Sequence, residues 1–422
     1  MLEMSRLRDD REGVEAGLAK RNVGMTDVDL AITLDDQRKA EQHEMDSIQA
    51  DTNAISRQIG DKMKSGDRDG AASLKAQVAD LKAKLTPLQD AHAQTKLELE
   101  NTLLRIPNVP HVSVPPGRDA EDNEVYQAGP KALPVLPEGA KPHWELGKQY
   151  QLFDLELGVK LTGSGFPVYR GRGAKLQRAL IAYFLDRATA EGYEEFLPPH
   201  LVNAESARGT GALPDKEGQM YHAVADDLYL IPTAEIPITN IYRGDIVDES
   251  DLPVKMCGYT PCFRREAGSY GKEVRGLNRV HQFDKVEIVR IERPEDSYAA
   301  LNDMLAHVAG LLEALDLPYR ILKLCGGDQT FTSTITYDFE VWSAAQKLWL
   351  EVSSVSNFET FQANRLNLRI RDGKTKRLAH TLNGSALALA RIVASILENN
   401  QGPNGIAIPE VLQPYTGFAV ID

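Results

Sequence analysis

The stretch "CFRREAGSYGKEVRGLNRVHQFDKVE" occupies residues 262–287 and holds ten charged residues and a histidine. Its two ends read as strands, whereas its centre is rich in glycine, so we predict two antiparallel strands joined by a long mobile loop. On the returning strand Phe283, Lys285 and Glu287 share one face, while Val286 and Ile288 share the other, because side chains alternate along a strand. The apolar face is expected to pack inward and the polar face to line a site.

The polar face of this strand also carries Arg279 and His281. Guanidinium groups suit phosphate or carboxylate, an aromatic ring suits stacking, and a carboxylate suits an amine or hydroxyl. This combination predicts a nucleotide site. The sequence has no GxxxxGK[ST] loop, and "GRGAKL" at 171–176 is only a fragment of a dinucleotide fingerprint. The alternative is a surface ribbon with ion pairs across its strands.

The chain has 422 residues, 42% of them hydrophobic, and a formal net charge of −13. This length is enough for two or three domains, and the composition is that of a folded soluble protein. No apolar run resembles a signal peptide or a membrane span, so we expect a cytoplasmic protein with no membrane partner. Three cysteines cannot all pair, and we expect reduced structural thiols. An acidic total argues against coating nucleic acid, but a local basic patch can still bind phosphate.

From Thr26 the chain reads as helix for almost eighty residues, interrupted by "KSGDRDG" at 64–70. Apolar residues recur every three or four positions in both halves, which predicts two antiparallel helices packed along one narrow seam. The seam positions are Ile48, Thr52, Ile55 and Ile59 in the first half and Leu74, Val78, Leu81, Leu85 and Leu88 in the second. At ~1.5 Å per residue the arm is on the order of 50 Å long. Pro87 is expected to kink its second helix.

The outer part of this arm is basic, with seven Lys or Arg against four Asp between residues 57 and 84. The basic residues are Arg57, Lys62, Lys64, Arg68, Lys75, Lys82 and Lys84. One interpretation is an ordinary solvated coiled-coil surface. The other is a rod that follows a phosphate backbone, since neutralised phosphates release counterions.

Eight prolines fall between residues 107 and 142, which predicts an extended connector. After it, helical runs such as 174–192 alternate with strand-like runs such as "VEIVRIE" and "RLNLRIR". No regular strand–helix repeat appears, so the fold class is predicted as α+β with a mainly antiparallel sheet. The expected domains are an N-terminal arm at 1–106, the connector at 107–146 and a catalytic domain at 147–422.

The stretch at 262–287 resembles motif 2 of the class II aminoacyl-tRNA synthetases, in the version of the seryl-tRNA synthetase family. Five further segments resemble that family in the same order. They are the helical hairpin at 27–105, like its tRNA-binding arm; "ALIAYFLDRATAEGYEEFLPPHLVN" at 179–203, like motif 1 with its dimer-interface helix; "IPTAE" at 231–235, like its serine-pocket signature; "LWLEVSSVSNFETFQANR" at 348–365, like its metal and ATP strand; and "HTLNGSALALARIVASILENNQ" at 380–401, like motif 3.

The resemblance implies an ATP site. Its residues would be Arg264, Arg265, Glu266, Phe283, Glu351, Val352, Ser353, Ser354 and Arg391, with Arg264, Glu351 and Arg391 catalytic. Arg264 would hold the α-phosphate and the serine carboxylate, neutralising charge in the transition state. Glu266 would accept from the adenine amino group, while Phe283 and Arg391 would cover the two faces of the base. Glu351 and Ser354 would hold Mg²⁺ through ATP, because that ion takes few protein ligands and bridges phosphates.

The resemblance also implies a serine pocket and a tRNA contact. The serine-binding residues would be Thr233, Ala234, Glu235, Arg264, Glu287, Asn383 and Ser385. The residues of the arm that would bind tRNA are Arg57, Lys62, Lys64, Arg68 and Lys75. Carboxylates suit the ammonium group of serine, and a buried acceptor for its hydroxyl would penalise alanine, which leaves that acceptor unpaired.

The implied reaction has two steps. The serine carboxylate attacks the α-phosphorus of ATP, giving seryl-adenylate and pyrophosphate, and the 3′-terminal ribose of tRNA(Ser) then takes the seryl group. A homodimer and service to tRNA(Sec) are implied by the family alone. Two alternatives are a ligase that loads a small amino acid on a carrier protein and a non-catalytic RNA-binding relative.

Arg265 departs from the family pattern, which usually has serine there. As a strand neighbour of Arg264 its side chain should point away from that residue. This leaves two roles open beside the ATP site, namely a surface position facing the loop and contact with the acceptor end of tRNA.

Overall fold

The computed structural model describes residues 1–215, 218–266 and 275–422. The predicted mobile tip of the hairpin, with Lys272, lies outside them. Within these ranges no helix is both long and apolar enough to cross a membrane. Cys257, Cys262 and Cys325 are buried and free of disulfides, as expected.

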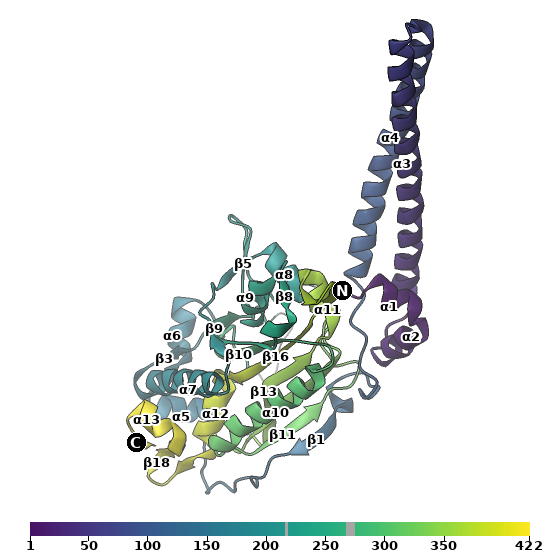
Figure 1. Cartoon of the computed structure of the whole chain (residues 1–422). Helices are drawn as coiled ribbons and strands as arrows, with labels where there is room; N and C mark the ends of the chain where they lie inside the picture. Colours follow the sequence, from purple (N-terminus) through teal and green to yellow (C-terminus); the bar gives the residue numbers. More distant parts are fainter. Residues whose placement is uncertain (216–217, 267–274) are drawn as a thin grey trace. The chain divides into compact units, whose positions relative to one another are not determined.

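Contacts divide the chain into two compact units, one formed by residues 2–16 and 23–107 and the other mainly by residues 17–22 and 108–422. The first unit contains the predicted arm. Its long helices are α3 (Thr26–Lys64) and α4 (Arg68–Leu103), and α1 (Met4–Asp9) precedes them. They run side by side in opposite directions (Figure 1), which confirms the predicted hairpin.

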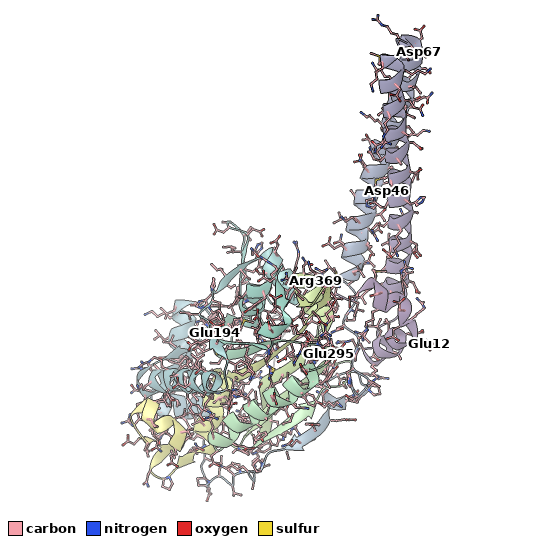
Figure 2. The ribbon with its side chains drawn as sticks, in the orientation of Figure 1. Glu12, Asp46, Asp67, Glu194, Glu295 and Arg369 are labelled. Carbon is pink, nitrogen blue, oxygen red and sulfur yellow. The ribbon has the colours of Figure 1, made fainter. Side chains whose placement is uncertain are left out.

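The seam between α3 and α4 follows the predicted periodicity. Thr52 is buried, and the eight other positions predicted for it are half-buried on a rod whose remaining surface is mostly exposed. Asp67 forms the turn at the tip (Figure 2), where its carboxylate accepts a hydrogen bond from the Gly70 amide at 2.9 Å and caps α4. Helix α4 continues through Pro87.

The second unit is built on an eight-stranded sheet, which confirms the predicted α+β class (Figure 1). In spatial order its strands are β1 (Glu124–Ala128), β11 (Tyr319–Lys323), β12 (Ile335–Ser343), β13 (Leu348–Asn357), β16 (His380–Ala388), β10 (Gln282–Glu292), β9 (Val254–Phe263) and β4 (Glu194–Glu195). Neighbouring strands are antiparallel except β4 and β9. Strands β9 and β10 are the two antiparallel strands that were predicted from the stretch at residues 262–287.

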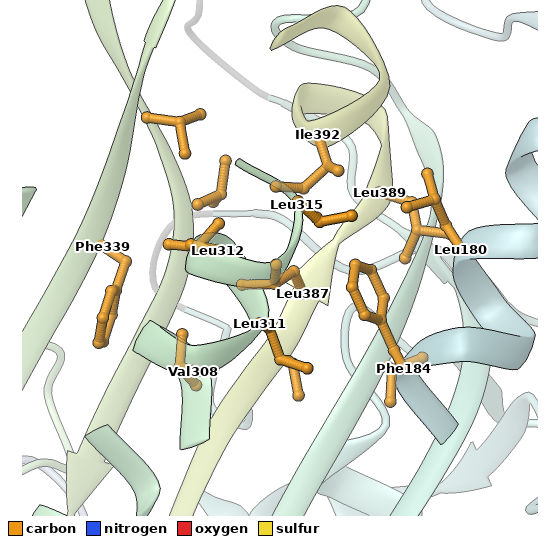
Figure 3. Close-up of a cluster of buried hydrophobic side chains, with 14 of the residues drawn as sticks. Leu180, Phe184, Val308, Leu311, Leu312, Leu315, Phe339, Leu387, Leu389 and Ile392 are labelled. Carbon is orange, nitrogen blue, oxygen red and sulfur yellow. The ribbon is translucent and has the colours of Figure 1, made fainter. Parts of the chain in front are cut away.

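Three helices pack against this sheet through one large apolar cluster: α7 (Gly171–Ala190), α10 (Ser297–Ala314) and α12 (Leu389–Asn399). Figure 3 shows the Phe184 ring from α7 directed toward Leu311 of α10 and Leu387 of β16, which belong with Leu180 to the same cluster. Val286 and Ile288 of β10 belong to the same cluster. The face of β10 predicted to be apolar therefore faces the core, leaving the alternate residues for a site.

Smaller elements complete this unit. The other helices are α5 (His143–Gln149), α6 (Leu155–Leu161), α8 (Ala204–Thr210), α9 (Glu235–Thr239), α11 (Thr360–Leu366) and α13 (Gln413–Thr416), with α2 (Arg11–Lys20) divided between the units. The short sheets pair β2 (Phe153–Asp154) with β3 (Val168–Tyr169), β5 (Leu201–Asn203) with β7 (Leu228–Leu230) and β6 (His222–Ala223), β14 (Arg369–Asp372) with β15 (Thr375–Leu378) and β8 (Ile246–Asp248), and β18 (Gly405–Ala407) with β17 (Gln401–Gly402) and β19 (Val420–Ile421).

Two strand predictions were wrong in part. The run "RLNLRIR" begins in α11 and becomes strand only at Arg369. The segment at 348–365 is strand only as far as Asn357, after which the chain turns into α11. In the first run Leu366 and Leu368 are fully buried, and a buried helix and a buried strand both produce apolar runs that periodicity over a few residues cannot tell apart.

Candidate active site

A cavity of about 430 Å³ lies over the polar face of β10 and its neighbours. The predicted ligand residues that line it are Thr233, Glu235, Arg264, Glu266, Phe283, Glu287, Glu351, Val352, Ser353, Ser354, Asn383, Ser385 and Arg391. They come from β9, β10, β13, β16 and the starts of α9 and α12, or from residues directly beside these elements. Segments separated by as many as 158 residues in sequence thus contribute to one site, as the sequence predicted.

One end of the cavity holds a buried charge pair. The Lys285 Nζ lies 2.5 Å from Glu287 Oε2, and both side chains are nearly inaccessible. The Thr233 hydroxyl accepts from Lys285 at 2.8 Å and donates to Glu287 at 3.0 Å. Ser385 is the cross-strand partner of Glu287. Each buried charge is thus paired and hydrogen-bonded, the condition under which burial of an ion is tolerated.

Glu235 lies at the same end, at the first position of α9. Burial, followed by the negative charge of Glu287, raises the pKa of Glu235 to about 7. The Gln362 amide donates to its carboxylate at 2.7 Å and is oriented by Thr381 at 2.8 Å. The buried Asn383 amide lies beside the same carboxylate and lowers its pKa in part. This end therefore offers carboxylates and an amide donor to a small polar ligand.

The other end of the cavity is dominated by arginines. The Arg264 guanidinium lies 5.2 Å from the centre of the Phe283 ring. Arg391 is held at both sides, because its Nε donates to the Asn278 carbonyl and its Nη1 to the Glu351 carbonyl, each at 2.7 Å. Both guanidinium groups are therefore oriented by neighbours, and they face a cavity where an anion would neutralise them.

Glu266 pairs with Arg279 through the Nε of the arginine. Its backbone has a positive φ of 49°, a conformation that side-chain-bearing residues adopt rarely and mostly where surrounding contacts hold them. The strand β9 has ended at Phe263, so this conformation turns the Glu266 carboxylate toward the cavity. The sequence analysis placed Arg279 on the polar face of the returning strand but did not predict its ion pair with Glu266.

Strands β12 and β13 bring three oxygen-bearing side chains to this part of the sheet, and one of them, Glu351, lies beside Arg391. Ser354 of β13 is the cross-strand partner of Asp338 and hydrogen-bonds to it. Burial and then the charge of Glu351 raise the pKa of Asp338. Its Oδ1 is buried without a hydrogen-bond partner in the described ranges. Glu351, by contrast, is half exposed to the cavity, so it is the carboxylate that a metal ion can reach.

Comparisons with known proteins give the family. The model of the seryl-tRNA synthetase N-terminal domain matches residues 1–110, and that of the class II core domain of tRNA synthetases (G, H, P, S and T) matches residues 221–400. The serine–tRNA ligase of Salinibacter ruber is 49% identical, over 100% of this chain and 99% of that protein. The chain belongs to the seryl-tRNA synthetase family. It is thus an aminoacyl-tRNA synthetase.

Other relatives of the synthetase agree over the full length. The serine–tRNA ligase of Chlorobium phaeovibrioides is 45% identical, over 100% of this chain and 99% of that protein. The solved seryl-tRNA synthetase of Pyrococcus horikoshii, complexed with ATP, superimposes with a TM-score of 0.93 at 33% identity, covering 100% of this chain and 99% of the other. The resemblance found in the sequence is thereby confirmed.

Two residues predicted for the site of the synthetase do not line the cavity. Ala234 is fully buried, and its methyl group packs in an apolar cluster with Ile238 and Met256. Arg265 is exposed, and its amide donates to the Gln219 carbonyl at 2.8 Å. Its side chain approaches Gly218. Arg264 lines the cavity and Arg265 does not, and both the role of Arg265 in the ATP site and its orientation away from Arg264 remain predictions.

Several residues of this site were not predicted from the sequence. Asn278 is the clearest, since its carbonyl anchors Arg391. Thr210 and Thr332 also line the cavity. Lys285 was placed on the site-lining face by the alternation of β10, but its pairing with Glu287 was not predicted. The others lie in turns or at helix ends, where local sequence carries no periodic signal.

Proposed function

We propose that the synthetase activates L-serine with ATP in this cavity and transfers the seryl group to tRNA(Ser). The observation that carries the proposal is the division of the cavity into an acidic end and an arginine-rich end. Along β10, Phe283 and Glu287 are four residues apart on one face, which corresponds to roughly 13 Å. Between these positions there is space for an aminoacyl group, a phosphate and a base in a row.

Serine is proposed to bind at the acidic end. The ammonium group would meet Glu287 and Thr233, and the hydroxyl would meet Glu235 and Asn383. Alanine lacks the hydroxyl and would leave these buried polar groups unpaired, which makes discrimination against it large. The raised pKa of Glu235 supports this assignment, because a carboxyl that is protonated near neutrality can either donate to or accept from a hydroxyl.

ATP is proposed to bind at the arginine-rich end. Arg264 would neutralise the α-phosphate and the serine carboxylate as the two meet, so that positioning and electrostatics supply the catalysis. Phe283 and Arg391 would cover the faces of adenine, with Glu266 accepting from its amino group. The Pyrococcus relative, which is complexed with ATP and superimposes over the whole chain, supports this use of the site.

The residues present fit a magnesium ion held partly by ATP. Glu351 and Ser354 line the cavity and offer hard oxygens beside the arginine-rich end. In the described ranges no three His, Cys, Asp or Glu side chains gather to hold a metal ion by themselves. This donor set suits Mg²⁺, which keeps few protein ligands and takes phosphate oxygens. When bound, it would neutralise charge on the phosphates.

The arm is proposed to bind tRNA. Arg57, Lys62, Lys64, Arg68 and Lys75 are all exposed on its outer half. Lys62 pairs with Asp67 and Lys64 approaches Asp61, whereas the three others have no carboxylate within 4.0 Å among the described residues. Exposed cations on a thin rod suit a phosphate backbone. A homodimer formed through α7, a cytoplasmic location and service to tRNA(Sec) are further parts of the proposal.

The decisive experiment is ATP–pyrophosphate exchange with a panel of small amino acids, run beside aminoacylation of total tRNA. Serine should give the largest exchange, and the same enzyme should charge tRNA(Ser). If another amino acid exceeds serine, the pocket assignment fails. Exchange without tRNA charging would indicate the carrier-protein ligase, and absence of both would indicate a non-catalytic relative. Purified tRNA(Sec) in the charging assay tests that substrate separately.

A further inference from the structure

A buried histidine in the connector contacts the motif 3 helix. His143 begins α5, and Glu398 lies in the last turn of α12; both side chains are completely inaccessible. The Glu398 Oε1 accepts from the His143 Nδ1 at 2.7 Å, from the His143 amide at 3.0 Å and from the Gln346 amide at 2.9 Å. Ser343 donates to the other oxygen.

The other ring nitrogen of His143 contacts the end of motif 2. The Leu277 amide donates to His143 Nε2 at 2.8 Å. A backbone amide can only donate, so Nε2 carries no proton, and the single ring proton is on Nδ1 and directed to Glu398. The neutral imidazole therefore bridges the motif 3 helix and the backbone of residue 277. Neither cationic histidine nor the opposite tautomer satisfies both contacts.

The turn at residues 275–278 is fitted closely around this ring. Gly276 has a φ of 69°, and a Cβ there would lie 2.2 Å from His143 Nε2. The Arg275 guanidinium lies 4.6 Å from the centre of the neighbouring Trp144 ring. The backbone that leads into β10 is thus packed against α5 by shape as well as by a hydrogen bond.

From this turn the contacts reach the cavity. The Asn278 side chain donates to Gln346 at 2.7 Å, and Gln346 in turn donates to Glu398. The Asn278 carbonyl accepts from Arg391 Nε at 2.7 Å, and both Leu277 and Asn278 line the cavity. Contacts that start at a fully buried histidine therefore end at the guanidinium assigned to ATP.

We propose that His143 is a positioning residue for ATP: by accepting from the Leu277 amide it fixes the Asn278 carbonyl, and through it the orientation of Arg391. This inference rests on the proposed function, since it assumes that Arg391 contacts ATP. His143 touches no substrate. The serine end of the cavity lies on other residues, so the effect on serine should be small.

Two substitutions separate the two contacts of the ring. In His143→Asn the amide nitrogen takes the place of Nδ1 and keeps Glu398, but no acceptor remains for Leu277. In His143→Gln the side-chain oxygen reaches the place of Nε2 and keeps Leu277, but the contact with Glu398 is lost. Both variants are measured in the full-length enzyme by ATP–pyrophosphate exchange, with separate KM values for ATP and serine, and by thermal unfolding.

The proposal predicts a split between the variants. His143→Asn should raise the KM for ATP about tenfold, the size of one lost hydrogen bond, and change the KM for serine less than about twofold. His143→Gln should change the KM for ATP much less, even where its Tm falls as far. If both variants raise the KM for ATP in proportion to their loss of Tm, or if the KM for serine rises equally, His143 is only a core contact and the proposal is wrong.

A glycine pair keeps the proposal testable if His143→Asn does not fold. Gly276→Ala pushes the turn away from the ring while leaving the His143–Glu398 contact intact, and it should raise the KM for ATP selectively. Gly373→Ala is the control, because Gly373 also has positive φ, 56°, but a Cβ there meets nothing within 4 Å. Equal KM values in the two variants overturn the inference. Wild-type exchange with serine, measured beside them, tests the proposed function independently.

Discussion

The catalytic cavity and the helical arm both use charged residues, but in opposite surroundings. In the cavity Lys285 and Glu287 are nearly inaccessible and paired at 2.5 Å, so each depends on a particular neighbour. On the arm the basic residues are exposed, and several have no ion-pair partner within the described ranges. Buried charges interact strongly because little water screens them. Exposed charges are screened, so each contributes little and the effect depends on how many there are. Single substitutions should therefore be decisive in the cavity and cumulative on the arm.

The largest effect is expected from Arg264→Ala. Removing the guanidinium that we assign to the α-phosphate should lower exchange by about 10²–10³-fold, as for other preorganised electrostatic groups. Arg265→Ala is the matched comparison, since it removes the same charge one residue along the chain from a side chain that does not line the cavity. Its exchange rate should fall far less than that of Arg264→Ala, and the size of any loss measures what Arg265 contributes to the ATP site. Equal losses in the two variants would refute the distinction between buried and exposed charge in this segment.

The next effect is expected from neutralising the arm. Five cationic residues are changed together to Gln, namely Arg57, Lys62, Lys64, Arg68 and Lys75, and kcat/KM for tRNA(Ser) should fall about 10- to 100-fold. The slope of log KM against log salt concentration should decrease by roughly four, because five phosphate contacts are lost. Pyrophosphate exchange without tRNA should be unchanged. Each single Gln variant should show only a small share of the loss. An unaffected charging rate in the fivefold variant would show that the arm is merely a solvated rod.

A smaller effect concerns pH and stability. Glu235 has a folded pKa of about 7 and an ordinary value of 4.5, so between these values the folded state binds more protons than the unfolded state. Stability should therefore fall as pH rises from 4.5 to 7, by an amount on the order of 3 kcal/mol at most. Glu235→Gln should flatten this slope in urea unfolding at pH 5, 6 and 7. Glu195→Gln, an exposed control, should leave it in place; a slope unchanged in both would contradict the burial argument.

The smallest effect on activity is expected from Pro87→Ala. The proline interrupts the hydrogen bonding of α4, which continues through it, so alanine should stabilise the arm by about 1–3 kcal/mol. Chemical unfolding followed by circular dichroism measures this change. Charging should vary little, because the exposed cations of the arm are unaltered. A large loss of charging would instead show that the bend expected at Pro87 is needed by tRNA.

Much of the fold was already contained in local sequence patterns. The seam of the arm follows from a repeat of three and four residues, and the polar face of β10 from strict alternation, because helix and strand geometry direct side chains to one side at these periods. The order of the six family-like segments indicated which residues would share one cavity. Where the periodic run was short and burial complete, as at Leu366, the end of a helix was mistaken for strand.

Only the tertiary structure decided how these residues are held. The pairing of Glu266 with Arg279, the support of Glu235 by Gln362 and the bridge from His143 to Glu398 join residues 13 to 255 positions apart. The pKa of Glu235 depends on burial among several segments at once. Such contacts arise when separate elements pack together, and neither spacing nor composition within one segment records them. The sequence determined which groups are present, and packing determined what each group does.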